Sequence, residues 1–457
     1  MRYDLTTLAF DLPEDINRAF HAGDFDTFSR LLDARLQSER TSPMMKKRIE
    51  LEKELLPRRL RRYPYTRETA MKRMRERVPD FTEAELDAME TDGCVDYIYY
   101  GGEKRYVSSF SGTLIRMSGD LAAREVKQPE PDDGTNPDDF IADIKEKGFA
   151  AYRFRVKSSL KVEDEFFDPA KTYTVHIPVP ARSAQQDESR IRIQADGYVS
   201  SPDAYQRTVC FQRRSDTNLP FEMEIEYESR LKYVDPFRDA PRIVYPDVPA
   251  PCGDDLSEQY PHIVFTPYLR QLAAWIAGDE KRPLYLAKRV YDYITLNVRY
   301  SFMRTYFLID RHAEYCALNM KGDCGLQAIL FITLCRILGI PARWQSGWTV
   351  DKFSTGDHDW AMFWTAEFGW LFADPSYGGG AHRKGKEDRR QYYFGNLDCF
   401  RMVANSRYQS EFDPPKKHER FDPYDSQDGE VETETEGFDS NAFDRTDITQ
   451  VFEKLDR

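Results

Sequence analysis

The sequence lacks long apolar runs. No stretch of 18 or so apolar residues occurs in its 457 positions, so we expect no membrane-spanning helix. The N-terminal segment is acidic from Asp4 onward and has no long apolar core, which is unlike a signal peptide. We therefore expect a cytoplasmic protein with no membrane partner.

Cysteine is scarce, and its spacing excludes several kinds of site. The chain has seven cysteines, and none belongs to a Cys-X-X-Cys pair; they are at positions 94, 210, 252, 316, 324, 335 and 399. This pattern disfavours structural disulfides and a zinc knuckle, and a reducing compartment would keep a functional thiol free. No calcium-loop spacing occurs. Gly378–Gly380 is expected to be a flexible loop, and no Lys-Ser/Thr follows it to form a phosphate-binding loop. We expect neither a metal nor another cofactor.

Charge is abundant but unevenly spread. The net charge is −13, and residues 411–457 hold 15 acidic against 6 basic side chains, whereas residues 46–77 hold 13 basic against 5 acidic. Such runs are most often solvated faces or polar tails. The basic stretch alternatively predicts docking onto an acidic partner or onto another part of this chain. It does not resemble a nucleic-acid-binding module, so no nucleic-acid partner is expected.

A chain of this length has room for two or three domains. Residues 1–130 are predicted to be mainly helical, with a helix at 44–60 cut by Pro57 and Pro64. Thr82 and Glu85 form a capping box for a later helix, and the Gly101-Gly102 turn predicts a hairpin between 95–100 and 105–110. Residues 129–137, rich in Pro and Asp, are the expected linker.

Residues 138–236 alternate apolar and polar side chains in several short runs, most strictly at 221–227. This period of two predicts a small antiparallel β-domain. Residues 406–457 are predicted to be an acidic tail with a disordered part at 413–437, a possible edge strand at 430–436 and a final helical turn at 448–455.

Residues 255–405 show a different pattern, with a helical spacing of apolar residues followed by short predicted strands. Leucines spaced by four at 326, 330, 334 and 338 predict a helix that ends at Gly339-Ile340-Pro341. Residues 342–350, 358–363 and 370–373 are predicted strands. The chemistry-bearing residues therefore lie on a helix followed by an antiparallel sheet.

Cys324 stands where that helix should begin. Unpaired N–H groups and the positive end of the helix dipole would favour its thiolate, and its own N–H could donate to a developing oxyanion. Gly322 and Gly325 flank it and would permit a tight turn and close approach of a substrate backbone.

His358 opens a predicted strand and Asp374 ends the next one. A thiol, an imidazole and a carboxylate in these places are the parts of an activated cysteine nucleophile, with His358 moving the proton and Asp374 orienting the ring. Asp357 and Asp359 flank His358 but should point to the opposite face of the strand. Trp360 could exclude water.

Each of these residues has a structural alternative. A lone cysteine on a helix is usually a core residue, a lone histidine on a strand is usually a satisfied polar residue, and Asp before Pro usually marks a turn. The joint arrangement favours chemistry. Cys335 and Cys316 are expected to pack in the core or a loop, and His312 and His382 have no ligand spacing.

Together these motifs resemble the transglutaminase-like superfamily core over about 255–405. The matching motifs are Gly322-Asp323-Cys324, Gly339-Ile340-Pro341-Ala342-Arg343, His358-Asp359-Trp360, Gly369-Trp370 and Asp374-Pro375, preceded by Asn297-Val298-Arg299-Tyr300. Residues 174–180 are similar to the β-domain that often precedes this core in bacterial members. One departure is Gly325-Leu326-Gln327 after the cysteine, where the family often has an aromatic or alanine-rich stretch.

The resemblance implies an α+β fold with a papain-like core, in which a nucleophile helix packs on an antiparallel sheet. It implies catalysis by Cys324, His358 and Asp374, and places Gly322, Gly325 and Trp360 around the substrate. We expect a cysteine protease or amidase that hydrolyses a peptide or amide bond of a peptide or protein through a Cys324 thioester. The alternatives are amine transfer to a protein glutamine and a non-catalytic peptide-binding scaffold. Residues 1–130 and the β-domain could dock partners.

Overall fold

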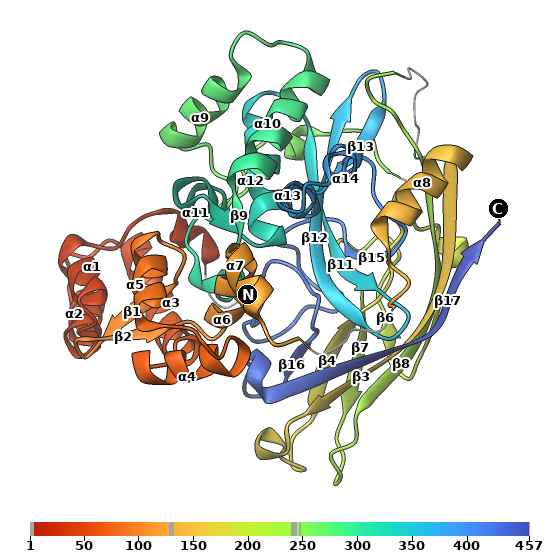
Figure 1. Ribbon diagram of the computed structural model, residues 1–457. Coiled ribbons are helices and arrows are strands. Elements are labelled where there is room, and N and C mark those ends of the chain that lie inside the picture. The colour runs from red at the N-terminus through yellow and green to blue at the C-terminus, as the bar shows by residue number, and fades with distance from the viewer. Residues whose placement is uncertain (1–3, 128–131, 239–244, 246–247, 457) are drawn as a thin grey trace.

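A computed structural model describes residues 4–127, 132–238, 245 and 248–456 of the chain. In Figure 1 the N-terminal helices lie on one side and the long strands β3, β8 and β17 on the other, with the helices and sheet of the core between them. The structure is a mixed α+β fold, as predicted.

The N-terminal region is built from short capped helices and one hairpin. The helices are α1 (Glu14–His21), α2 (Phe25–Gln37), α3 (Pro43–Arg62), α4 (Arg67–Arg77), α5 (Glu83–Thr91), α6 (Phe110–Met117) and α7 (Gly119–Arg124), and the hairpin joins β1 (Tyr97–Tyr100) to β2 (Glu103–Tyr106). Thr82 and Glu85 form the predicted capping box of α5. Short 3-10 helices occur at Leu5–Ala9, Asp164–Phe166, Glu188–Arg190, Gly253–Asp255, Tyr306–Leu308 and Ser440–Ala442.

The predicted break at Pro57 is wrong, because α3 continues through it to Arg62. Proline in a helix costs roughly 3 kcal/mol. Leu51 and Leu55 on one side of Pro57 and Arg58 on the other are all buried, so packing on both sides holds the helix together.

The basic stretch makes contacts within this chain. Arg59 Nη1 donates to Leu308 O at 3.3 Å, Arg58 Nη1 donates to Arg420 O at 3.2 Å, and Arg61 pairs with Asp439 at 2.8 Å. Residues 129–131 of the expected linker lie outside the described residues, and the remainder leads into α8 (Pro137–Lys147).

Two antiparallel sheets form the β-domain. One has the order β17-β3-β8-β5, from β17 (Phe443–Leu455), β3 (Phe149–Val162), β8 (Phe221–Lys232) and β5 (Arg192–Ala195). The other has the order β16-β4-β7-β6, from β16 (Glu430–Glu432), β4 (Tyr173–Pro178), β7 (Thr208–Arg213) and β6 (Tyr198–Val199). Their alternating apolar residues belong to one hydrophobic core, which continues into the core domain.

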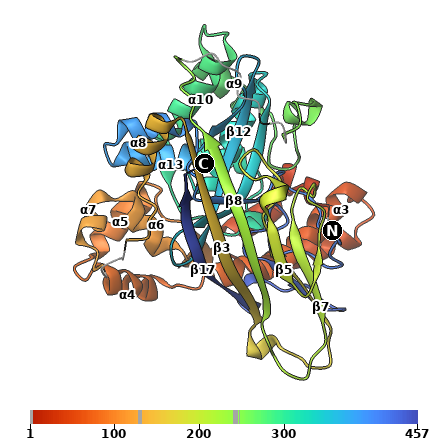
Figure 2. The same ribbon diagram turned by 90° about the vertical axis from the view of Figure 1, so that its right-hand side faces the viewer.

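The C-terminal segment is part of these sheets rather than a free tail. Strand β17 pairs along nearly the whole length of β3, and Figure 2 shows the two strands side by side with β8 and β5. The predicted helical turn at 448–455 is therefore wrong, whereas the predicted edge strand exists as β16. The expected disorder is also wrong, because acids of this segment have partners: Glu430 pairs with buried Lys416 at 2.6 Å, and Glu432 accepts backbone N–H bonds from Lys417 and His418.

The remaining elements form the core domain. Its helices are α9 (Pro267–Ala277), α10 (Pro283–Asn297), α11 (His312–Asn319), α12 (Cys324–Ile337), α13 (Pro375–Arg383) and α14 (Glu387–Tyr392). Its sheet has the order β14-β13-β12-β11-β15, from β14 (Phe394–Gly395), β13 (Gly369–Ala373), β12 (Thr355–Thr365), β11 (Ala342–Val350) and β15 (Arg401–Asn405). A short parallel pair joins β9 (Arg299–Tyr300) to β10 (Lys321–Gly322). Helix α12 packs on the sheet, as Phe331 against Phe363 illustrates.

Gly378–Gly380, expected to be a loop, lies inside α13. Gly378 has no room for a side chain, because a Cβ there would lie 2.0 Å from the hydroxyl of Tyr291 on α10. Among the parts of the chain that the structure describes, no helix is both long and apolar enough to cross a membrane.

Substitution of Phe452 tests how much strand β17 contributes to the stability of the fold. Its ring contacts Tyr152, Phe154 and Phe400, with centroids 5.7, 5.4 and 5.6 Å away. We expect Phe452→Ala to lower the free energy of unfolding by about 2 kcal/mol, measured by urea denaturation. Ile448→Ala on the same strand is the control, because Ile448 is 55% exposed and should change stability by less than about 0.5 kcal/mol. Equal effects of the two variants would contradict this role of Phe452.

Candidate active site

Cys324 is the first residue of α12, as predicted, and it meets the unpaired part of β12. Strand β13 pairs with β12 only from Ala361 to Thr365, so the part of β12 before Ala361 has no strand beside it on that edge. The start of α12 lies there. Cys324 is partly exposed, unlike Cys335 and Cys316, which are buried.

Asp323 caps α12. Its Oδ1 accepts the N–H of Leu326 at 3.1 Å and the hydroxyl of Tyr306 at 2.6 Å. Burial raises the pKa of Asp323 to about 6, although these donors oppose the shift. A carboxyl group that titrates near neutrality therefore lies next to the thiol in the sequence.

The thiol of Cys324 contacts Asp359. Sγ donates to Asp359 Oδ2 at 3.3 Å. Burial, followed by the carboxyl groups of Asp359 and Asp323, raises the pKa of Cys324 well above its ordinary value, although the Asp359 backbone N–H favours the thiolate. In this arrangement the sulfur is a protonated donor, not the preformed thiolate that the helix start predicted.

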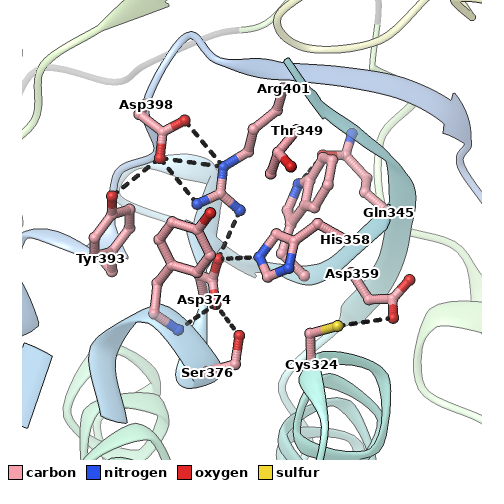
Figure 3. Close-up of polar contacts among 12 residues, drawn as sticks. Cys324, Gln345, Thr349, His358, Asp359, Asp374, Ser376, Tyr393, Asp398 and Arg401 are labelled. Atoms are coloured by element: carbon pink, nitrogen blue, oxygen red, sulfur yellow. Dashed lines mark hydrogen bonds and ion pairs between the residues drawn. The ribbon is translucent and has the colours of Figure 1, made fainter. Parts of the chain in front are cut away.

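His358 and Asp374 form a direct pair, as Figure 3 shows. His358 Nε2 lies 2.7 Å from Asp374 Oδ2, and both side chains are buried. The ring lies between Asp374 and Cys324, with its other nitrogen, Nδ1, on the thiol side (Figure 3). Asp374 follows β13 and caps α13, so the pair joins adjacent strands as predicted.

Arg401 supports this pair from β15. Its Nη1 donates to Asp374 Oδ2 at 2.6 Å, and its Nη2 pairs with Asp398 at 3.0 Å. Burial alone would raise the pKa of Asp374, but His358 and Arg401 outweigh it and hold that pKa below its ordinary value. Asp374 is therefore an anion at neutral pH, and it accepts the N–H of His358 Nε2. The ring is left with Nδ1 free to accept a proton.

Aromatic rings flank His358 on two sides. Trp360 stacks at a centroid distance of 5.8 Å, and Tyr377 lies at 4.6 Å. Trp360 is fully buried, and its indole N–H donates to Gln345 at 2.7 Å. It therefore packs behind the ring, and its expected place beside the substrate stays a prediction.

Gly322 and Gly325 are both buried, and their expected roles in substrate approach stay predictions. A Cβ at Gly322 would lie 2.8 Å from the Cβ of Leu326. A Cβ at Gly325 would lie 2.0 Å from the hydroxyl of Tyr306 and 2.8 Å from Asp359 Oδ2. These glycines let the chain pack tightly around the thiol.

The C-terminal segment supports Asp359. Gln427 Nε2 donates to Asp359 Oδ1 at 2.9 Å and to the carbonyl of His358 at 3.0 Å. Asp359 also interacts with the carboxyl group of Asp425, and burial raises the pKa of both well above their ordinary values. The two carboxyl groups therefore hold protons that an exposed pair would lose.

Sequence reasoning missed Asp359, Arg401 and Gln427. Strand alternation correctly kept Asp359 away from the His358 ring, but it did not reveal that the thiol contacts Asp359 at the edge of β12. Arg401 and Gln427 follow Asp374 by 27 and 53 positions and carry no local motif.

A cavity of about 510 Å³ lies elsewhere, between the β-domain and the edge of the core sheet. Its lining includes Arg343, Arg407 and Tyr408 but none of Cys324, His358 and Asp374. Arg343 pairs with Asp255 and Arg407 with Asp254, so these charges of the wall neutralise one another.

Asp323 predicts a pH-dependent loss of stability. Its pKa is about 6 in the folded protein and near 3.8 in the unfolded chain, so the folded state binds more protons between these values. The stability from this group is fully present below about pH 4 and is lost as pH rises through 6. Asp323→Asn keeps the cap and should therefore gain stability relative to the unsubstituted protein between pH 4 and 7, by up to ~3 kcal/mol. Urea denaturation at several pH values measures this difference, and a constant difference would contradict it.

Comparison with known proteins identifies one family. Residues 270–375 match the model of the transglutaminase-like superfamily core. Comparison with curated proteins gives no match.

Three solved structures are similar to parts of the chain. A candidate cysteine protease from Cytophaga hutchinsonii is 15% identical, with a TM-score of 0.39, over 67% of this chain and 90% of that one. The periplasmic domain of TgpA from Pseudomonas aeruginosa is 16% identical, with a TM-score of 0.26, over 55% and 96%. A candidate protease from Parabacteroides distasonis is 8% identical, with a TM-score of 0.22, over 51% and 60%.

The family match contains the start of α12, the strand with His358 and the end of β13, which are the elements that bring the thiol, the ring and the carboxylate together. Residues 270–375 are thus a domain of the transglutaminase-like superfamily.

Proposed function

We propose that the protein is a cysteine-dependent acyl-transfer enzyme that hydrolyses a peptide or amide bond. The observation that carries this proposal is the buried His358–Asp374 pair, whose ring lies on the side of Cys324, a partly exposed residue at a helix start. In this proposal Cys324 is the nucleophile, His358 the general base and acid, and Asp374 the group that orients the ring.

The first step is activation of the sulfur. The thiol leaves Asp359 by rotation of the Cys324 side chain, and His358 Nδ1 takes its proton. The imidazolium formed is stabilised by anionic Asp374 at 2.7 Å. The N–H groups at the start of α12 stabilise the thiolate.

The thiolate then attacks the carbonyl carbon of the scissile bond. The Cys324 N–H is one of the helix-start donors without an intrahelical acceptor, and it faces the developing oxyanion. Collapse of the tetrahedral intermediate breaks the C–N bond, and His358 gives its proton to the leaving amine. Water, activated by His358, cleaves the thioester, which releases the acid and restores the thiol.

The substrate is proposed to be a peptide or protein, with residues 1–130 and the β-domain as possible docking regions. Amine transfer differs only in the nucleophile that cleaves the thioester. A cytoplasmic location, too, is part of the proposal.

Selective alkylation tests the proposed pair. With limiting iodoacetamide at pH 6–7, we expect Cys324 to react faster than Cys252, and His358→Ala to remove this advantage at least tenfold because no base takes the thiol proton. Mass spectrometry of peptides measures both sites in one sample. Cys252 is the internal control, because it is exposed and lies outside the site. Cys324 reacting no faster than Cys252, or reacting equally in both proteins, would refute the proposed activation.

Asp359 should restrain the thiol. Asp359→Asn removes the carboxyl group that raises the pKa of Cys324 most strongly after burial, so alkylation of Cys324 near pH 8 should rise about threefold or more. Asp357→Asn is the matched control, because Asp357 lies on the other side of His358 and pairs with Arg445 instead. A slower reaction in Asp359→Asn would show that this carboxyl group helps ionisation.

A further inference from the structure

Two arginines from different regions lie near the candidate active site without a carboxylate partner. Arg116 is in the last turn of α6, in the N-terminal region, and Arg383 ends α13 of the core. Both are exposed. Within the described ranges of the chain, neither guanidinium forms an ion pair, although the protein has a net charge of −13.

Arg116 is held by aromatic rings. Its guanidinium lies over Tyr300 at 4.9 Å from the ring centroid and over Phe302 at 5.1 Å. The N-terminal region is fixed against this segment, because Thr113 Oγ1 donates to the carbonyl of Phe302 at 3.3 Å. A guanidinium stacked on a ring keeps its planar fork of N–H donors free for a carboxylate.

Arg383 lies back over the glycines of α13. A Cβ at Gly379 would be 3.3 Å from its Nη1, and one at Gly380 would be 3.9 Å from its Nη2. Each glycine costs a helix about 1 kcal/mol relative to alanine. Packing against Tyr291 accounts for Gly378, and a Cβ at Gly379 would crowd the Arg383 guanidinium, whereas one at Gly380 would make only ordinary van der Waals contact with it.

Tyr300 connects both arginines to the thiol. It pairs with Gly322, two residues before Cys324, in the short parallel bridge. Burial and the nearby charges of Cys324 and Asp323 raise the pKa of Tyr300. Partial desolvation of the guanidinium, followed by the positive charge of Arg116, lowers the pKa of Arg383, and Tyr300 acts in the opposite direction. The two cations and the sulfur therefore share one neighbourhood.

The charges around the sulfur otherwise disfavour an anion. Asp323, whose pKa is about 6, lies beside the thiol as the negative charge, whereas the carboxyl groups of Asp359 and Asp425 hold protons and supply no positive charge there. Arg116 and Arg383 are like charges held close together, which costs free energy. A bound ligand of negative charge would recover that free energy. Arg116 and Arg383 are thus suited to compensate an acidic group on a molecule that reaches Cys324.

We propose that Arg116 and Arg383 form an anion subsite beside Tyr300, and that the substrate is a peptide with a carboxylate close to the bond that Cys324 attacks. The inference rests on the proposed function and adds a substrate class to it. The carboxylate belongs either to an acidic side chain or to the end of a peptide.

Iodoacetate and iodoacetamide test the anion subsite, because they alkylate thiols by the same reaction but only iodoacetate carries a negative charge. The quantity to measure is the ratio of the iodoacetate to the iodoacetamide rate constant at Cys324, divided by the same ratio at exposed Cys252. We expect the double variant R116Q/R383Q to lower this quotient about tenfold, with each arginine contributing part of the effect. In 0.5 M salt the quotients of the unsubstituted protein and the double variant should differ less. Arg105→Gln is the matched control: Arg105 also lies over a tyrosine ring, Tyr100 at 5.8 Å, but elsewhere in the N-terminal region.

The outcomes separate the two claims. His358-dependent labelling of Cys324 by iodoacetamide with an unchanged quotient in R116Q/R383Q overturns the anion subsite alone. Loss of selective Cys324 labelling by iodoacetamide overturns the proposed function instead. If Arg105→Gln lowers the quotient equally, the proposed subsite is also overturned. The effect would then come from the overall charge of the protein rather than from Arg116 and Arg383.

The source of the carboxylate follows from protection experiments. Acetyl-aspartic acid α-amide carries only a side-chain carboxylate, acetyl-glycine only a terminal carboxylate, and acetyl-asparagine α-amide neither. Each is added at millimolar concentration, and the slowing of Cys324 alkylation by iodoacetamide is measured. One of the two carboxylates should protect at least threefold more than the amide does, and this protection should be lost in R116Q/R383Q. Equal protection by all three compounds would contradict the proposal.

Discussion

The buried carboxylate of Asp374 is the constraint on which the candidate site depends. It accepts from His358 Nε2 and Arg401 Nη1 through one oxygen, and from the Ser376 hydroxyl and the Tyr377 N–H through the other. It therefore fixes the imidazole, starts α13 and neutralises an arginine at once. Removing one partner of a buried ion pair typically costs ~3–5 kcal/mol, because the other charge stays buried. The stability of this region and the orientation of the ring therefore share one cause.

The sulfur lies between two opposing environments. On one side is an imidazole prepared to accept a proton, and on the other is Asp359, which accepts the thiol hydrogen and is held in place by Gln427. The partial positive charge of the helix start favours a thiolate, whereas burial and two carboxyl groups oppose it. A helix start alone therefore does not determine the state of the thiol. Rotation of one side chain changes which environment acts on it.

Local patterns predicted much of the site. The leucine spacing placed Cys324 at the start of α12, and the positions of His358 at the start of one strand and Asp374 at the end of the next predicted their pairing. What failed depends on distant partners: Arg401 and Gln427 lie far along the chain, and the acidic segment read as a disordered tail because its partners, such as Lys416 for Glu430, are visible only after folding. Pro57 and Gly378 were misjudged because packing outweighed their local preferences.

Segments late in the chain, among them strand β17, support parts of the fold that are synthesised earlier. Helix α12 leaves the ribosome more than a hundred residues before Leu455, yet Gln427 and Asp425 hold Asp359, and β17 then covers the edge of β3. A nascent chain paused after α13 contains Cys324, His358 and Asp374 but lacks Arg401 and every later support. The contacts that Gln427 and Asp425 make with Asp359 can therefore form only after the segment that holds Cys324, His358 and Asp374 has been synthesised.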